Sequence, residues 1–158
     1  MVSKISRNAD SQRVHDMAVR LIADDRFAVQ DWKVVTNPAS EQNDSVEHVG
    51  FHHVPDIVAR HEQQVVALGE VETLESISDE EAAQWVQLGR LCSRLYLFVP
   101  HGTEHVAAEL IEKHGVCCAG LRAYSFAEDN TLSIESVHIP NGHSKWNDHE
   151  WWSDLGRN

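Results

Sequence analysis

Three acidic side chains near the middle of the sequence have the types and spacing of a divalent-cation site. Asp56 follows Pro55, and Glu70 and Glu72 stand two residues apart further along the chain. Residues two apart on a β-strand point to the same face, so we expect Glu70 and Glu72 to share one. If the two segments pair as a hairpin, Asp56 lies across from Glu70, and the three carboxylates converge.

Carboxylates gathered in this way repel one another, and burial makes each charge more costly. The repulsion is relieved by protons, by a Lys or Arg side chain, or by a hard divalent cation. Only Lys33 and Arg60 are expected nearby in the sheet. We therefore expect Mg²⁺ or Mn²⁺, which favour oxygen ligands and keep several waters. Such an ion polarises a phosphoryl oxygen and activates water for attack on phosphorus.

The elements that must position these side chains follow from hydrophobic periodicity and turn signals. The apolar stripe of a first helix is expected from Val14, Met17, Ala18, Leu21 and Ile22, with Asp10 or Ser11 as its cap. The remaining elements are expected as strands at 32–36, 48–60 and 64–73, a helix after a capping box at 78–81, a strand at 95–99, a helix at 103–114, and strands at 120–127 and 131–138.

Successive strands favour antiparallel pairing, and a later strand–helix–strand unit favours a parallel pair. The sequence therefore predicts an α/β fold in which helices flank a mixed central sheet. The short link 61–63 predicts a hairpin, with Asp56 near the middle of its first strand. Gly69 in the other strand indicates a bulge or a close backbone approach. The last strand is expected at an edge of the sheet.

Composition limits the function classes. The length of 158 residues, without an evident linker or repeat, predicts one domain. A net charge of -12 argues against a broad basic surface for nucleic acid, so such a role needs a local basic patch, bound metal or a partner subunit. A polar N-terminus and the lack of a long apolar run predict no signal peptide and no membrane segment, which leaves the cytoplasm as the expected location. Three cysteines do not form a disulfide framework.

The two acidic segments, VPDIV at 54–58 and LGEVET at 68–73, resemble the signature of the PD-(D/E)XK nuclease superfamily. The similarity covers about residues 10–126 and includes the element order of that superfamily. It implies a restriction-endonuclease-like domain in which Asp56, Glu70 and the Val71 carbonyl bind Mg²⁺ or Mn²⁺. The resemblance also implies that Gln84, on the following helix, supports the site.

One position departs from that signature, because Glu72 stands where the superfamily has lysine. Some restriction endonucleases of the superfamily carry glutamate there. Glu72 would then act as a general base or as a ligand of a second metal ion. Alternatively, the change marks a domain that has lost catalysis. His52 shares the strand parity of Asp56 and is a further candidate for contact with substrate or metal.

The resemblance thus implies a metal-dependent phosphodiesterase that acts on nucleic acid, with DNA favoured over RNA, and that works as a homodimer. The first alternative is a catalytically inactive nuclease-fold module for binding or assembly. The second is a non-nuclease α/β protein whose carboxylates serve a small-molecule site. Residues 127–158, outside the resemblance, are expected to form the edge strand and a C-terminal extension rich in Trp and His. Its residues Trp146, Trp151 and Trp152 are expected to pack on the domain or on a partner.

Overall fold

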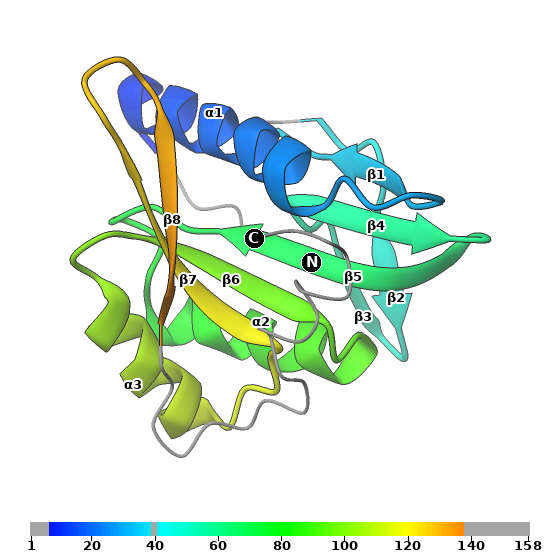
Figure 1. Cartoon of the computed structure of the whole chain (residues 1–158). Helices are drawn as coiled ribbons and strands as arrows, with labels where there is room; N and C mark the ends of the chain where they lie inside the picture. Colours follow the sequence, from blue (N-terminus) through cyan, green and yellow to red (C-terminus); the bar gives the residue numbers. More distant parts are fainter. Residues whose placement is uncertain (1–6, 39–40, 138–158) are drawn as a thin grey trace.

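The computed structural model describes residues 7–38 and 41–137, which form an α/β fold with a mixed central sheet (Figure 1). The strand order in the sheet is β1 (Lys33–Thr36), β4 (Ile57–His61), β5 (Gln64–Val71), β6 (Leu95–Pro100), β7 (Gly120–Phe126) and β8 (Leu132–Val137). The β5–β6 and β6–β7 pairs are parallel, and the other pairs are antiparallel. The predicted fold class is confirmed, and β8 lies at an edge as expected.

Three helices cover the two faces of this sheet. Helix α1 (Ala9–Arg26) lies on one face, and α2 (Asp79–Leu91) and α3 (Glu104–His114) lie on the other (Figure 1). Strand β6 is buried on both faces, since its side chains alternate between the two apolar cores. None of the helices in the described part of the chain is long and apolar enough to span a membrane.

The helix ends follow the sequence signals closely, with one exception. The Ser78 hydroxyl accepts a hydrogen bond from the Glu81 backbone N–H at 3.2 Å, which starts α2. Gly115 ends α3 in the left-handed conformation, with a φ of 65°. The cap predicted for α1 was wrong, because the Asn8 side chain accepts from the Ser11 N–H at 2.8 Å.

The predicted second strand, 48–60, is two separate pieces in the structure. A small hairpin of β2 (Val46–His48) and β3 (Phe51–His53) turns at Gly50, whose φ is 76°. Strand β4 then begins at Ile57, after Pro55, which has no N–H for a ladder. Asp56 therefore lies directly before β4, and its predicted position in mid-strand was wrong.

The predicted hairpin at 61–63 is confirmed as the β4–β5 turn, in which Glu62 and Gln63 both have positive φ. Gly69 marks a close approach, since a Cβ there would lie 3.1 Å from the side chains of both Ile57 and Phe27. The register irregularity of this strand pair lies elsewhere, between Ala59 and Arg60.

Single-domain organisation over 1–158 stays a prediction. The Trp residues expected to pack at the C-terminus fall at 138–158, outside the described residues.

Candidate metal centre

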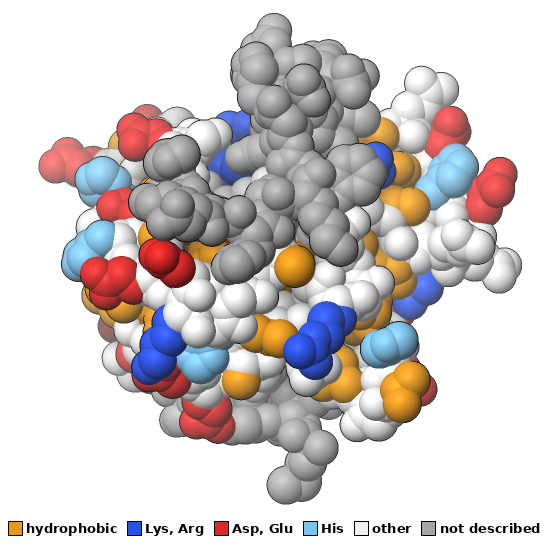
Figure 2. All heavy atoms as spheres, turned by 90° about the horizontal axis from the view of Figure 1, so that it is seen from below, with side chains coloured by type: hydrophobic (Ala, Val, Ile, Leu, Met, Phe, Trp, Pro, Cys, Tyr) orange, Lys and Arg blue, Asp and Glu red, His pale blue; other side chains and the backbone are white. Residues whose placement is uncertain are grey.

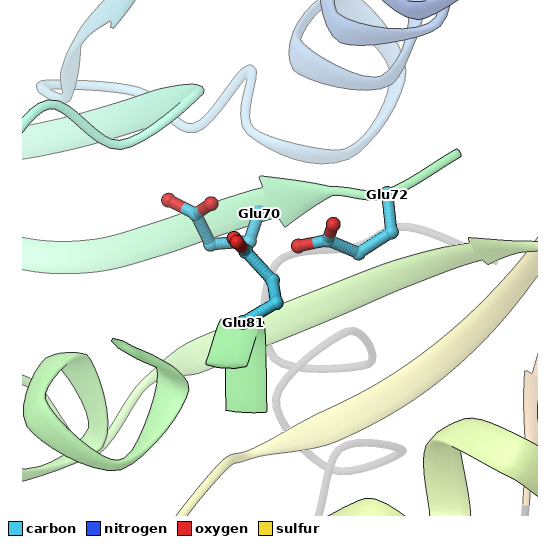
Figure 3. Close-up of side chains that lie close together, drawn as sticks. All are labelled: Glu70, Glu72 and Glu81. Atoms are coloured by element: carbon cyan, nitrogen blue, oxygen red, sulfur yellow. The ribbon is translucent and has the colours of Figure 1, made fainter. Parts of the chain in front are cut away.

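Three glutamates converge where β5 ends and α2 begins. Glu70 and Glu72 extend from the end of β5, and Glu81 reaches them from the first turn of α2 (Figure 3). One carboxylate oxygen of each residue lies within 4.8 Å of the others. Their residues are 4%, 0% and 6% exposed, respectively, so water provides little screening of their charges. This buried cluster of three acidic residues could hold a metal ion.

The same local rules that build the fold build this cluster. Alternation along β5 sends Leu68, Glu70 and Glu72 toward α2, while Val71 packs in the core on the α1 side. The cap at Ser78 fixes the first turn of α2 and so places Glu81 beneath the end of β5.

Glu72 is held by hydrogen bonds at both of its carboxylate oxygens. The Trp85 indole N–H donates to Oε1 at 3.0 Å, and the Ser76 hydroxyl donates to Oε2. Burial raises the pKa of Glu72, while these two bonds act in the opposite direction. The two donors therefore fix the orientation of the Glu72 side chain inside the protein.

The other two glutamates favour protonation when no cation is present. Burial, followed by repulsion from Glu72, raises the pKa of Glu81 to about 10. The carboxyl groups of Glu72 and Glu81 lie close together, so a proton on Glu81 removes the repulsion between them. Burial and the charges of Asp56 and Glu72 raise the pKa of Glu70 well above its usual range. A divalent cation would replace these protons as the source of positive charge.

Asp56 lies beside this cluster, at the mouth of the site. Its side chain is 16% exposed. The Val71 N–H donates to Asp56 Oδ2 at 2.8 Å, so this carboxylate continues the β-ladder where the backbone of β4 no longer does. Its Oδ1 lies 3.2 Å from Nε2 of His15, a buried residue of α1. Burial opposes a charge on His15, but Asp56 outweighs it and raises the His15 pKa to about 9.

Two prolines lack the N–H groups that would otherwise donate hydrogen bonds to backbone carbonyls at the end of β5. Extension of the Ile57–Gly69 register would pair Pro55 with Val71, and Pro55 has no N–H for the Val71 carbonyl. In the parallel register with β6, the residue that should donate to the Glu72 carbonyl is Pro100. The Tyr124 hydroxyl donates to that carbonyl instead, at 2.5 Å. The Val71 carbonyl thus stands next to Asp56 and Glu70 without a ladder donor from β4.

His53, rather than His52, is the histidine at the site. His53 Nε2 lies 3.2 Å from Glu70 Oε1, and the residue is 5% exposed. Burial lowers the pKa of His53, which favours the neutral imidazole, and its hydrogen bond with Glu70 orients that side chain. His52 is exposed and pairs with Glu47 at 3.0 Å. His52 therefore lies outside the glutamate cluster, and its expected contact with substrate or metal stays a prediction.

Gln84 and the two nearby cations expected from the sequence do not join the cluster. Gln84 is half-buried on α2, and within 7–38 and 41–137 no hydrogen bond links it to the three glutamates. Its role stays a prediction, whereas Glu81 and Trp85 are the α2 residues that reach the site. Arg60 is engaged by Asp44 through bonds of 2.8 and 3.0 Å, and Lys33 is exposed on β1.

The available donors fit a hard divalent cation. All the candidate ligand atoms are oxygens: those of Glu70, Glu72, Glu81, Asp56 and the Val71 carbonyl. Oxygen-only sets suit Mg²⁺, Mn²⁺ or Ca²⁺ rather than a thiolate- or imidazole-bound ion.

Comparisons with known proteins do not identify a relative. The chain matches no family model, no curated protein and no solved structure.

Proposed function

We propose that this protein is a metal-dependent phosphodiesterase of the nuclease type, acting on nucleic acid and preferentially on DNA. The observation that carries the proposal is the convergence of Glu70, Glu72 and Glu81 in a buried site, with Asp56 at its mouth. Buried carboxylates are costly unless they are neutralised or paired, and groups with strongly shifted pKa values cluster at functional sites. The resemblance to the PD-(D/E)XK superfamily supports the same assignment.

In this proposal Glu70 is the central ligand of Mg²⁺ or Mn²⁺. Asp56 and the Val71 carbonyl would complete the outer side of the site, and Glu72 and Glu81 the inner side. A bound cation supplies charge stabilisation to a phosphoryl oxygen and lowers the pKa of an attacking water. The hydrogen bond between His53 Nε2 and Glu70 Oε1 keeps Glu70 oriented, and His15 holds the Asp56 carboxylate. Glu72, already fixed by Trp85 and Ser76, would accept a proton from water.

The surface places a condition on how nucleic acid would bind. On the face seen in Figure 2, Lys and Arg side chains are scattered between acidic and histidine side chains. The net charge of -12 makes attraction of a polyanion weak away from the site. We therefore propose that recognition depends on the cation and on a homodimer, which would present two sites to the two strands.

Cleavage of supercoiled plasmid DNA in Mn²⁺ tests this function. We expect nicking by the wild-type protein and a loss of about 100-fold in rate for Glu70→Gln and for Asp56→Asn, since each substitution removes a charged ligand but keeps its shape. Glu80→Gln is the matched control, because Glu80 is an exposed neighbour on α2. Equal nicking by wild type and Glu70→Gln would assign the cleavage to another source and contradict the proposal.

A second candidate is a nuclease-fold module that binds a cation without turnover. It is favoured by the complete hydrogen bonding of Glu72, which stands where the superfamily has its lysine. Binding of Mn²⁺ that depends on Glu70, without cleavage of DNA or RNA in any divalent ion, would support this candidate over the enzyme.

A further inference from the structure

A guanidinium group lies next to the carboxylates, although the sequence places it in an N-terminal arm. Arg7 immediately precedes Asn8, the N-cap of α1. Its Nε–H donates to the Thr73 hydroxyl at 3.0 Å. Thr73 directly follows Glu72 and is 5% exposed, whereas Arg7 is half-buried. The contact therefore brings a permanent positive charge to the rim of the acidic site.

The electrostatic influence of Arg7 extends to both sides of that rim. The guanidinium contributes to lowering the pKa of Glu72 on the β5 side. It also opposes the protonation of His15 on α1 and so acts to lower the pKa of that residue. Asp56, the more exposed carboxylate, contacts the same histidine at 3.2 Å. Arg7 thus contacts Thr73 and lies within Coulombic reach of Glu72 and of His15, the histidine that holds Asp56 at the mouth of the site.

We propose that Arg7 binds the phosphate group of the substrate at this mouth. This inference rests on the proposed phosphodiesterase function and names the residue that brings the anion to the carboxylates. A phosphodiester that approaches these acidic residues is repelled unless a cation of the protein meets it. Arg suits that task, since its planar fork donates two parallel hydrogen bonds to phosphate oxygens.

The bonding of Arg7 is compatible with this role. The contact to Thr73 uses Nε–H and fixes the plane of the guanidinium. Among residues 7–38 and 41–137, no side chain forms a hydrogen bond with the four N–H groups on its two terminal nitrogens. The other nearby cation, His15, is already engaged by Asp56 and Asp16.

The test compares Arg7→Gln, Arg7→Lys and wild type in two assays: Mn²⁺ binding by calorimetry, and cleavage kinetics on a DNA duplex in Mn²⁺. We expect unchanged Mn²⁺ affinity in both variants. Arg7→Gln should raise KM about 10- to 100-fold, as expected when a charge-assisted hydrogen bond is lost. Arg7→Lys should fall between, because it keeps the charge but not the fork. Arg13→Gln, on the exposed side of α1, is the control and should match wild type.

The outcomes separate this inference from the function on which it rests. Cleavage by Arg7→Gln with wild-type KM would overturn the role of Arg7 and leave the phosphodiesterase proposal intact. A wild-type protein that neither binds Mn²⁺ nor cuts DNA would overturn both. A thermal scan will show whether Arg7→Gln unfolds. In that case Arg7→Lys provides the test, because wild-type kinetics and a wild-type salt dependence in this variant would contradict the proposed bidentate contact.

Discussion

In the absence of divalent cations, Glu81→Gln should stabilise the protein at pH 7 by up to about 3 kcal/mol. The pKa of Glu81 rises from 4.5 to about 10 on folding. At neutral pH the unfolded chain therefore carries an ionised Glu81, and folding must take up a proton. Glutamine needs no proton and can still donate a hydrogen bond to Glu72. Removing a candidate metal ligand should thus strengthen the metal-free fold.

The sign of the pH dependence follows from the same linkage. A carboxyl group with a raised folded pKa binds more protons in the folded state, so stability falls as pH rises from 4.5 toward about 10. His15, whose pKa rises from 6.5 to about 9, loses its stabilising charge in the upper part of this range, which adds to the effect. Each proton that the folded state binds in excess of the unfolded state lowers the free energy of unfolding by about 1.4 kcal/mol per pH unit as pH rises.

Urea denaturation at several pH values, with chelator present, measures both effects. The wild type should be most stable near pH 5, and the gap between Glu81→Gln and wild type should widen toward pH 9. Saturating Mn²⁺ should stabilise the wild type by about 3 kcal/mol at 100 times its Kd and should stabilise Glu81→Gln by less, because the variant lacks one candidate ligand. Glu80→Gln serves as control and should behave as wild type in all conditions. A variant less stable than wild type at pH 8 would contradict the account of the cluster.

Gly89→Ala should destabilise the protein by about 3–4 kcal/mol. Gly89 lies in α2, where alanine is favoured over glycine by about 1 kcal/mol from helix propensity alone. A Cβ at this position, however, would lie 2.2 Å from the Cys117 carbonyl oxygen and 3.1 Å from its carbon. Both atoms belong to the backbone between α3 and β7, so no flexible side chain can move away.

Helix propensity alone predicts that Gly89→Ala stabilises the protein, whereas packing predicts that it destabilises the protein. The sign of the measured change in stability therefore distinguishes the two effects. Thermal and urea unfolding of Gly89→Ala should show the loss, and Arg90→Ala, at the exposed neighbouring position, should change stability by less than about 1 kcal/mol. A Gly89→Ala variant as stable as wild type would mean that α2 does not approach Cys117 as closely as the structure has it.

Local patterns were sufficient to predict most of the framework of this protein. The cap at Ser78, the stop at Gly115 and the apolar run of β6 each depend on few neighbouring residues, and all three were predicted. The segment before β4 was not, because its break depends on Pro55 and on the turn at Gly50 together. The alternating pattern of that region is typical of one strand. The break is evident only when the turn at Gly50 and Pro55 are considered together.

The site was only partly predictable for the same reason. Glu70 and Glu72 share a face because alternation along one strand fixes it. Glu81 was assigned only to the capping box, although its spacing to Trp85 and Leu88 places it on the buried stripe of α2. His15 reaches Asp56 from α1, and Arg7, which precedes the N-cap of α1, reaches Thr73 across 66 residues of sequence. No local pattern carries such information.

The central prediction is that a divalent cation binds between β5 and α2. Anomalous diffraction from a crystal soaked in Mn²⁺ tests this directly. We predict one anomalous peak that has Glu70 as a ligand. The other protein ligands would be Glu72 or Glu81 on one side of Glu70, or Asp56 and the Val71 carbonyl on its other side. The peak should be absent from crystals of Glu70→Gln. A fully occupied Mn²⁺ elsewhere on the protein, with the three glutamates still bonded only to one another and to Trp85, Ser76 and His53, would contradict it.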